Sequence, residues 1–288
     1  MRRARAYGCR VPLDAFLLAF AAAWVHGTSN VFLGRRREPD AAIAVALIVG
    51  VVAFAPLAAL TWRVDGGAVP YIAVSAALEL GYFAFLAAAY RASEVSLVYP
   101  VARGTAPVLV LLGAVVVLGR PTSVGQVVGV VTVAAGILLV RRVRLAPAAA
   151  DARGFLLALV TGGFIAGYTL VDKQGLLRAS PVSYIELVMI APAGLYALAI
   201  ARVRGLDALA RETTVRLSAV AIILFGTYVL VLFALRLAPA ASVSAVRETS
   251  VVIATGVAAL VTRERVGPGR LAGAVLVAAG IALVAFTG

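Results

Sequence analysis

Ten apolar runs of about twenty residues follow one another through this chain of 288 residues. A helix of that length crosses the hydrocarbon core of a bilayer and satisfies its own backbone hydrogen bonds there. Hydrophobic residues make up 63% of the sequence, against roughly 45–50% in soluble domains. The sequence therefore predicts an all-α, multi-pass membrane protein. The ten predicted transmembrane helices are 13–33, 41–62, 69–90, 96–118, 123–140, 154–172, 182–201, 215–235, 241–261 and 267–286.

The connections between these runs are short, so no soluble domain fits between them. The net charge of +13 comes from basic residues in small clusters between the runs, without the aromatic-interleaved basic faces that nucleic-acid binding uses. We therefore expect no nucleic-acid partner. Cys9 is the only cysteine and His26 the only histidine, which disfavours a disulfide, a metal site or redox chemistry within the chain. No cofactor is expected.

An internal repeat divides the sequence into two halves. At an offset of 144 residues, 125–140 matches 269–284 at ten of sixteen positions, and the pattern R-x-T at 103–105 recurs at 247–249. Each half holds five predicted spans, and an odd number makes the second half enter the membrane in the opposite sense. The sequence thus predicts two inverted five-helix repeats, 1–144 and 145–288, related by a pseudo-two-fold axis in the membrane plane. The linker at 141–153 is the predicted hinge between them.

Glycines spaced four apart occur in the last run of each half, at Gly125/Gly129 and at Gly269/Gly273. This spacing lets two helix backbones approach closely. We interpret these glycines as packing positions, either within the chain or between two chains. The glycines therefore leave open whether the protein forms a homodimer.

Arg103 and Arg247 are the most conspicuous candidate site residues. Each lies about 10 Å inside its apolar run, where a cation needs a carboxylate, carbonyl groups, water or a solute. Glu248 follows Arg247 directly but projects about 100° away from it, so we expect Glu248 to contact another helix. Glu79, near the middle of the third run, could pair with one arginine, or could bind and release a proton.

These groups suggest an anionic solute. Three carboxylates could neutralise the two arginines: Glu79, Glu186 and Glu248. Because Glu186 lies near a span end and Glu248 projects away from Arg247, one arginine is left without a permanent partner. We expect a carboxylate or a phosphate/phosphonate group to be held by Arg103 and oriented by Tyr99 and Thr105. In the alternative, Glu79 pairs with Arg103 while Arg247 binds carbonyl groups, which leaves a neutral cavity.

Further polar residues are open to two interpretations. His26 and Asn30 share one helix face and could bind a solute or another helix's backbone. Pro100 and Pro107 predict a kink or local unwinding of the fourth helix, and the ninth run contains no proline. The remaining polar side chains near the end of run six and the start of run seven are expected to be interfacial anchors: Tyr168, Asp172, Lys173, Tyr184 and Glu186.

Four short segments carry a family likeness: Y-P-V-A-R-G-T-A-P at 99–107, A-V-R-E-T-S at 245–250, H-G-T-S-N at 26–30 and G-Y-T-L-V-D-K at 167–173. With two five-span halves, the chain resembles the drug/metabolite transporter superfamily, specifically its EamA-type members. The resemblance implies a ten-helix transporter with a central cavity, which moves small metabolites, often outward. Smaller relatives couple to protons through a glutamate in the first span. This first span has only Asp14 at its edge, so the coupling ion stays open.

The leading functional hypothesis is therefore a secondary transporter of a small metabolite in the bacterial plasma membrane, an exporter of an anionic or zwitterionic solute. No phosphate-binding loop is present, so energy would come from a gradient or from another subunit. The alternative is a channel, sensor or scaffold; a membrane enzyme is less favoured, because no H-E-x-x-H, paired intramembrane aspartates or G-x-S-x-G constellation is visible. The resemblance implies cytoplasmic termini, although this places nine basic residues inside and fifteen outside, against the usual bias.

Overall fold

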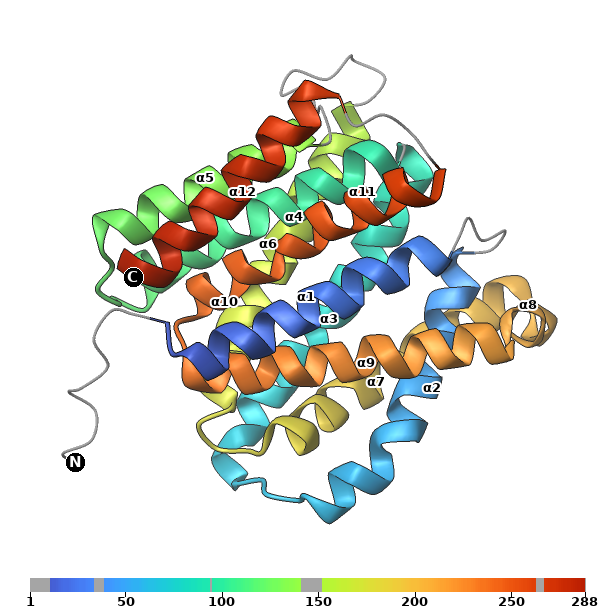
Figure 1. Cartoon of the computed structure of the whole chain (residues 1–288). Helices are drawn as coiled ribbons and strands as arrows, with labels where there is room; N and C mark the ends of the chain where they lie inside the picture. Colours follow the sequence, from blue (N-terminus) through green and yellow to red (C-terminus); the bar gives the residue numbers. More distant parts are fainter. Residues whose placement is uncertain (1–10, 34–38, 94, 141–151, 263–266, 288) are drawn as a thin grey trace.

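The computed structural model describes residues 11–33, 39–93, 95–140, 152–262 and 267–287, which form a bundle of helices (Figure 1). The helices are α1 (Leu13–Leu33), α2 (Pro39–Leu60), α3 (Val69–Ala92), α4 (Val95–Leu112), α5 (Val124–Val140), α6 (Ala152–Gly175), α7 (Pro181–Arg204), α8 (Leu206–Glu212), α9 (Val215–Leu237), α10 (Ala240–Arg247), α11 (Thr249–Thr262) and α12 (Pro268–Thr287). A 3-10 turn, η1 (Gly66–Ala68), precedes α3, and a π-helical segment, η2 (Gly113–Val117), follows α4. Most of the predicted hinge lies outside the described residues, as does Cys9.

All ten apolar runs are helical, and the all-α class is confirmed. Within the described residues, six helical segments are long and apolar enough to cross a membrane, and three others are shorter apolar helices. The ninth run is divided between α10 and α11, and the short helix α8 joins α7 to α9. Ten membrane crossings therefore remain a prediction.

Polar residues fix several helix ends. The Thr214 hydroxyl accepts a hydrogen bond from the backbone N–H of Leu217 at 3.2 Å and caps α9. Ser123 caps α5 in the same way, accepting from the N–H of Gln126 at 3.0 Å. Gly205 ends α7 at a φ of 79°, a conformation that side chains other than glycine's disfavour. Because these residues lie between apolar runs, the run limits and the helix limits nearly coincide.

The interruption predicted for the fourth helix lies elsewhere. α4 remains helical through Pro100 and Pro107, and its geometry changes only at η2. The break occurs in the ninth run at Glu248, between α10 and α11, where backbone bonds shorten to the i→i−3 type. The prediction of local unwinding at the prolines was wrong, because neighbouring helices can stabilise a proline-containing helix in an apolar environment. The alternative, a kink, stays a prediction.

Contacts between the halves come in symmetric pairs. α3 packs on α6 and α9 packs on α1; likewise α4 packs on α6 and α11 on α1. Shifting the residue numbers of one half by 144 turns the α3–α6 contact into the α9–α1 contact, and the α4–α6 contact into the α11–α1 contact. Two equivalent pairs, α5 with α12 and α2 with α7, pack on themselves. This is the contact pattern that two structurally equivalent halves produce around a two-fold axis.

The α5–α12 contact is an antiparallel backbone approach (Figure 1). A Cβ atom on Gly129 would lie 2.7 Å from the Gly280 carbonyl oxygen, and one on Gly136 would lie 2.8 Å from that of Gly273. Glycines seven residues apart on each helix therefore form the contact within one chain. Gly129 and Gly273 pack as predicted. The second contacting glycine is Gly136 on α5 and Gly280 on α12, rather than the predicted Gly125 and Gly269.

Two sets of contacts tie opposite ends of the bundle. At one end, Asp40 at the start of α2 accepts 2.9 Å hydrogen bonds from Arg91 of α3 and Arg204 of α7. At the other end, the α2–α3 connection meets the α6–α7 connection through the backbone. Ser180 N–H donates to the Arg63 carbonyl at 2.8 Å, and Asp65 N–H donates to the Arg178 carbonyl at 2.9 Å.

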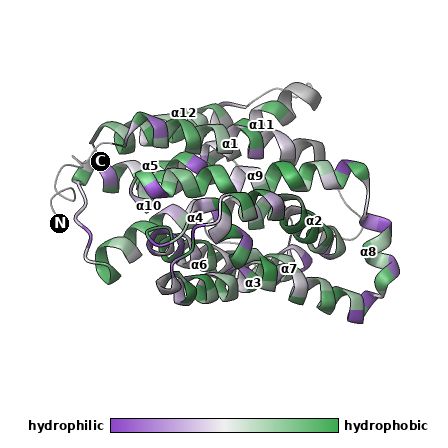
Figure 2. Cartoon of the chain, turned by 90° about the horizontal axis from the view of Figure 1, so that it is seen from below, coloured by the Kyte–Doolittle hydropathy of each residue, from purple (hydrophilic) through white to green (hydrophobic). Residues whose placement is uncertain are grey.

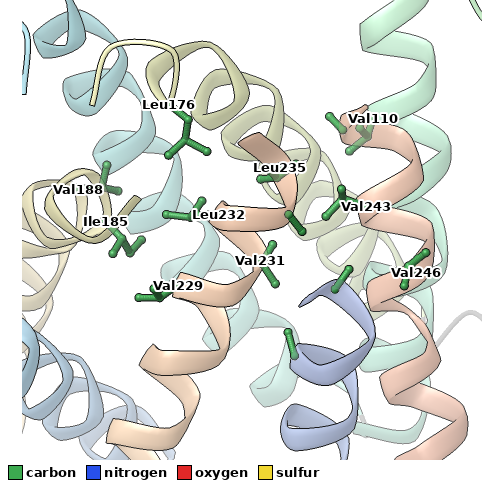
Figure 3. Close-up of a cluster of buried hydrophobic side chains, with 14 of the residues drawn as sticks. Val110, Leu176, Ile185, Val188, Val229, Val231, Leu232, Leu235, Val243 and Val246 are labelled. Carbon is green, nitrogen blue, oxygen red and sulfur yellow. The ribbon is translucent and has the colours of Figure 1, made fainter. Parts of the chain in front are cut away.

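The apolar core lies between the halves, where side chains from α4, α6, α7, α9 and α10 meet (Figure 3). Leu176, Leu232 and Val246 are fully buried there. Hydrophobic residues also cover most of the outer helix surfaces, while α8 carries hydrophilic ones (Figure 2). Large apolar side chains such as Val116 and Val203 are 78% and 81% exposed, as a lipid-facing surface requires.

Candidate functional site

Polar and charged side chains from five parts of the bundle meet in its interior. They project from α1, α3, α4 and α6 and from the α9–α11 region, so both halves contribute. Most are nearly fully buried; Glu79, Asp172 and Glu248 are 2%, 0% and 1% exposed. Buried charges are stable only when neighbouring groups compensate them.

Arg103 of α4 has three neighbours. Its guanidinium lies 3.5 Å from Glu248 Oε1 and 3.1 Å from His26 Nε2, and its Cζ lies 5.6 Å from the centre of the Tyr99 ring. A guanidinium can only donate hydrogen bonds, so His26 accepts at Nε2 and carries its proton on Nδ1. Glu248 thus contacts another helix, as its direction on the ninth run predicts. The sequence alternative in which Glu79 pairs with Arg103 is wrong, because Glu248 occupies that position.

His26 reaches Arg103 because α1 approaches α11 closely. A Cβ atom on Gly27 would lie 2.7 Å from the Ser250 carbonyl oxygen, so only glycine permits this approach. The H-G-T-S-N segment therefore has a structural role beside its histidine. The side chain of Asn30 lies outside what the structure describes.

Arg247, the last residue of α10, has a different environment. Its Cζ lies 5.6 Å from the centre of the Tyr228 ring, within the range of a cation–π interaction. Among the residues that the structure describes, no carboxylate lies within 4.0 Å of its guanidinium. The two equivalent arginines therefore differ: Arg103 is paired and Arg247 has an aromatic face.

Asp172 of α6 is the centre of a hydroxyl network. Its Oδ1 accepts hydrogen bonds from Ser75 at 2.5 Å and Tyr184 at 3.0 Å, and its Oδ2 accepts one from Tyr228 at 3.0 Å. Tyr228 thereby contacts Asp172 through its hydroxyl and Arg247 through its ring.

Aromatic rings connect the two halves at this level. The ring centres of Tyr82 and Tyr168 are 5.9 Å apart, and those of Tyr168 and Tyr228 are 6.0 Å apart, both edge to face. Two buried polar atoms here, the Tyr99 hydroxyl and Glu248 Oε2, have no hydrogen-bond partner among the described residues. Unsatisfied buried groups mark places where a ligand or water would bind.

Sequence reasoning located most, but not all, of this cluster. The Thr105 hydroxyl bonds within its own helix instead of to the cluster: it donates to the Val101 carbonyl at 2.8 Å, and the residue packs against Gly162 of α6. Asp172 and Tyr184, which were expected at the interface, are fully buried, and that expectation was wrong. The four-residue spacing of Tyr168 and Asp172, which share one face of α6, was the available signal.

Lys173, expected at the interface, is half-buried at the end of α9. Its ammonium group donates to the carbonyl groups of Leu235 and Ala238 and so caps the end of α9. Within the described part of the chain, no group of three His, Cys, Asp or Glu side chains is placed to hold a metal ion.

A comparison with protein families decides the membership of this chain. The EamA-like transporter family matches it twice, over residues 14–142 and 152–286. The chain belongs to the EamA-like transporter family. The predicted resemblance is thereby confirmed. This family membership and the apolar helices together indicate a multi-pass membrane transporter of small solutes.

Other comparisons concern the fold of this EamA-like chain. A crystal structure described only as "Crystal structure of protein" is similar over 95% of this chain and 99% of the other, with a TM-score of 0.77 and 15% sequence identity. At that identity the similarity shows the fold alone. No curated protein matches the sequence significantly.

Proposed function

We propose that this protein is a secondary transporter in the bacterial plasma membrane that exports a small solute bearing a carboxylate or phosphate group. Its two halves would form inverted repeats with ten membrane crossings, and the solute would bind in the polar cluster between them. The internal duplication, the symmetric contacts and the buried charges from both halves support this proposal.

The observation that carries the anionic character is the unmatched charge of Arg247. Arg103 has Glu248 at 3.5 Å, whereas Arg247 has the Tyr228 ring and no carboxylate within ion-pair distance among the described residues. An intramembrane guanidinium without a carboxylate is unfavourable in an empty site. A solute anion would supply the missing charge and could accept two parallel hydrogen bonds from the guanidinium.

The cluster also offers groups for the rest of the solute. The Tyr99 hydroxyl has no hydrogen-bond partner in the part of the chain that the structure describes, and the rings of Tyr82, Tyr168 and Tyr228 provide apolar faces. The proposal therefore places the anion at Arg247 rather than at Arg103, which acts as a positioning residue held by Glu248 and His26. Thr105 is not part of this proposed site.

Arg247→Lys tests the anion site. Lysine keeps the charge but loses the paired donors, so affinity for a bound acid should fall about tenfold or more. Purified protein is first screened by thermal shift against metabolites, each acid being paired with its neutral amide. The best acid is then used for binding and for counterflow in proteoliposomes.

Arg236→Lys is the matched control, because Arg236 is an exposed arginine on α9 near the end of the bundle. It should bind as wild type does. If the neutral amides stabilise the protein as well as the acids, or if Arg247→Lys binds the acid normally, the anionic-solute proposal is wrong. Counterflow separates a carrier from a sensor or scaffold, which would bind without exchange.

A further inference from the structure

A cavity of about 140 Å³ lies at one end of the bundle, between the last turn of α3 and the first turn of α6. It is lined by Ala88, Arg91, Ala92 and Arg153. Both arginines are exposed, so a ligand can reach them from outside. Arg91 lies about 18 Å along α3 from Glu79, so this cavity is separate from the polar cluster in the interior.

Close packing of α3 on α6 brings the two arginines together. A Cβ atom on Gly154 would overlap the side chain of Ser93, so glycine is needed where the helices approach. Ser93 ends α3 two residues after Arg91, and Gly154 follows Arg153 directly. The backbone contact between the two helices therefore positions both arginines at the cavity.

Positive charge is in excess at this cavity among the described residues. Arg91 donates to Asp40 Oδ2 at 2.9 Å, but the same oxygen also accepts from Arg204 at 2.9 Å. In the described part of the chain, no carboxylate lies within 4.0 Å of the Arg153 guanidinium. Three guanidinium groups thus share one described carboxylate. The N-terminus of α6, which begins at Ala152, adds a partial positive charge.

Apolar side chains continue from the cavity toward the middle of the bundle's outer surface. Phe85, three residues before Ala88 on the same face of α3, is 37% exposed, and its ring packs on that of Phe164 of α6 at 5.2 Å. Leu156, one turn after Arg153, is 61% exposed. A ligand here meets guanidinium groups at the end of the bundle and lipid-facing hydrocarbon one or two turns deeper. A phospholipid has its phosphate and its acyl chains in that same order.

We propose that the cavity binds the phosphate group of an acidic phospholipid, whose acyl chains lie against Phe85 and Leu156. Guanidinium groups offer paired N–H donors that match phosphate oxygens, and basic pockets between transmembrane helices suit such headgroups. The site does not depend on which solute is carried. Because Arg91 also bonds to Asp40, lipid binding and the contact between α2 and α3 share one side chain.

Native mass spectrometry of the full-length protein, with phosphatidylglycerol or phosphatidylcholine added in detergent, measures lipid binding directly. Phosphatidylglycerol should bind more tightly, because the ammonium group of phosphatidylcholine cancels the charge of its phosphate. Arg153→Gln removes no ion pair that the structure describes and should lower the affinity for phosphatidylglycerol about tenfold. Ala88→Leu keeps both arginines but fills the cavity, so it should weaken binding too. Arg202→Gln is the control, since Arg202 is an exposed arginine at the same end of the bundle that does not line the cavity.

Equal losses in Arg153→Gln and Arg202→Gln would show general attraction to a basic surface and would overturn the proposal. Unchanged binding in both Arg153→Gln and Ala88→Leu would overturn it as well. Inorganic phosphate and glycerol 3-phosphate, which carry the phosphate without acyl chains, should displace phosphatidylglycerol only weakly. If either binds as tightly as the lipid and loses that affinity in Arg153→Gln, the cavity takes a free phosphate compound and the assignment to a phospholipid is wrong.

Discussion

Arg103 and Arg247 are equivalent by duplication but not by environment. Glu248 follows Arg247 in the second half, and the residue at the same place in the first half is Gly104. The single carboxylate of this pair of motifs contacts the arginine of the opposite half. Because the two copies of the motif differ at this one position, their two arginines have a single motif carboxylate, that of Glu248, between them.

Glu248→Gln should destabilise the protein, because it leaves the buried Arg103 guanidinium without its carboxylate. The two side chains are only 8% and 2% exposed, and breaking a buried pair costs about 3 kcal/mol or more. Equilibrium unfolding of the reconstituted protein measures this loss. The double variant Arg103→Gln/Glu248→Gln should recover part of the stability. Equal stability of Glu248→Gln and wild type would show that the 3.5 Å contact contributes nothing.

At the level of residues, the sequence was informative where a charge interrupts an apolar run. Arg103, Arg247, Glu79 and Glu248 could be identified because such charges need partners. Asp172 could not, since it stands near the end of its run, where a polar residue is as well explained by the membrane interface. Its burial depends on Tyr184 and Tyr228 covering it, and these lie on other helices.

Among the helices, the α5–α12 contact shows best how the repeat determines packing. Gly129 faces Gly280 and Gly136 faces Gly273. The offset of 144 relates Gly129 to Gly273 and Gly136 to Gly280, so equivalent glycines of the two halves form the contact. The sequence revealed the repeat and its glycines, but not the spacing that the contact uses. The break at Glu248 was equally hidden, because no proline or glycine marks it.

Gly136→Ala should weaken this contact, because the added methyl group would meet the backbone of α12. The Gly273 carbonyl oxygen lies 2.8 Å from the ideal Cβ position, so the helices must separate. Overpacking of this kind costs about 1–3 kcal/mol, which unfolding of the purified protein would detect. Gly163→Ala is the control, since no atom lies within 4 Å of its Cβ position. Comparable destabilisation by both variants would argue against the backbone approach.

In the molecule as a whole, the polar cluster lies between two ties, one at each end of the bundle. Asp40 joins α2 to α3 of its own half and to α7 of the other half. In the proposed transport cycle, exchange between outward and inward access requires such ties to break and re-form. The Asp40 contacts join α2, α3 and α7 at one end in this conformation.

Asp40→Asn should loosen that end alone. Asp40 is 7% exposed and accepts two charged hydrogen bonds at 2.9 Å, so the loss should favour open conformations up to about tenfold. Hydrogen–deuterium exchange should rise near the start of α2 and the ends of α3 and α7. Asp207→Asn, an exposed change on α8, should not have this effect. Faster exchange throughout the protein would indicate general destabilisation instead.

The other end is held by amide-to-carbonyl hydrogen bonds, at 2.8 Å and 2.9 Å, between the α2–α3 and α6–α7 connections, with the exposed Arg178–Asp65 ion pair beside them at 3.8 Å. Dissolved ions shield charges from each other over about 8 Å at physiological ionic strength, but an amide bonded to a carbonyl has no net charge to shield. An exposed ion pair contributes little to begin with. Raising the salinity should therefore weaken the contacts at the Asp40 end more than those at the peptide-bonded end, so in the proposed carrier the ionic composition of one compartment would bias the direction in which it faces.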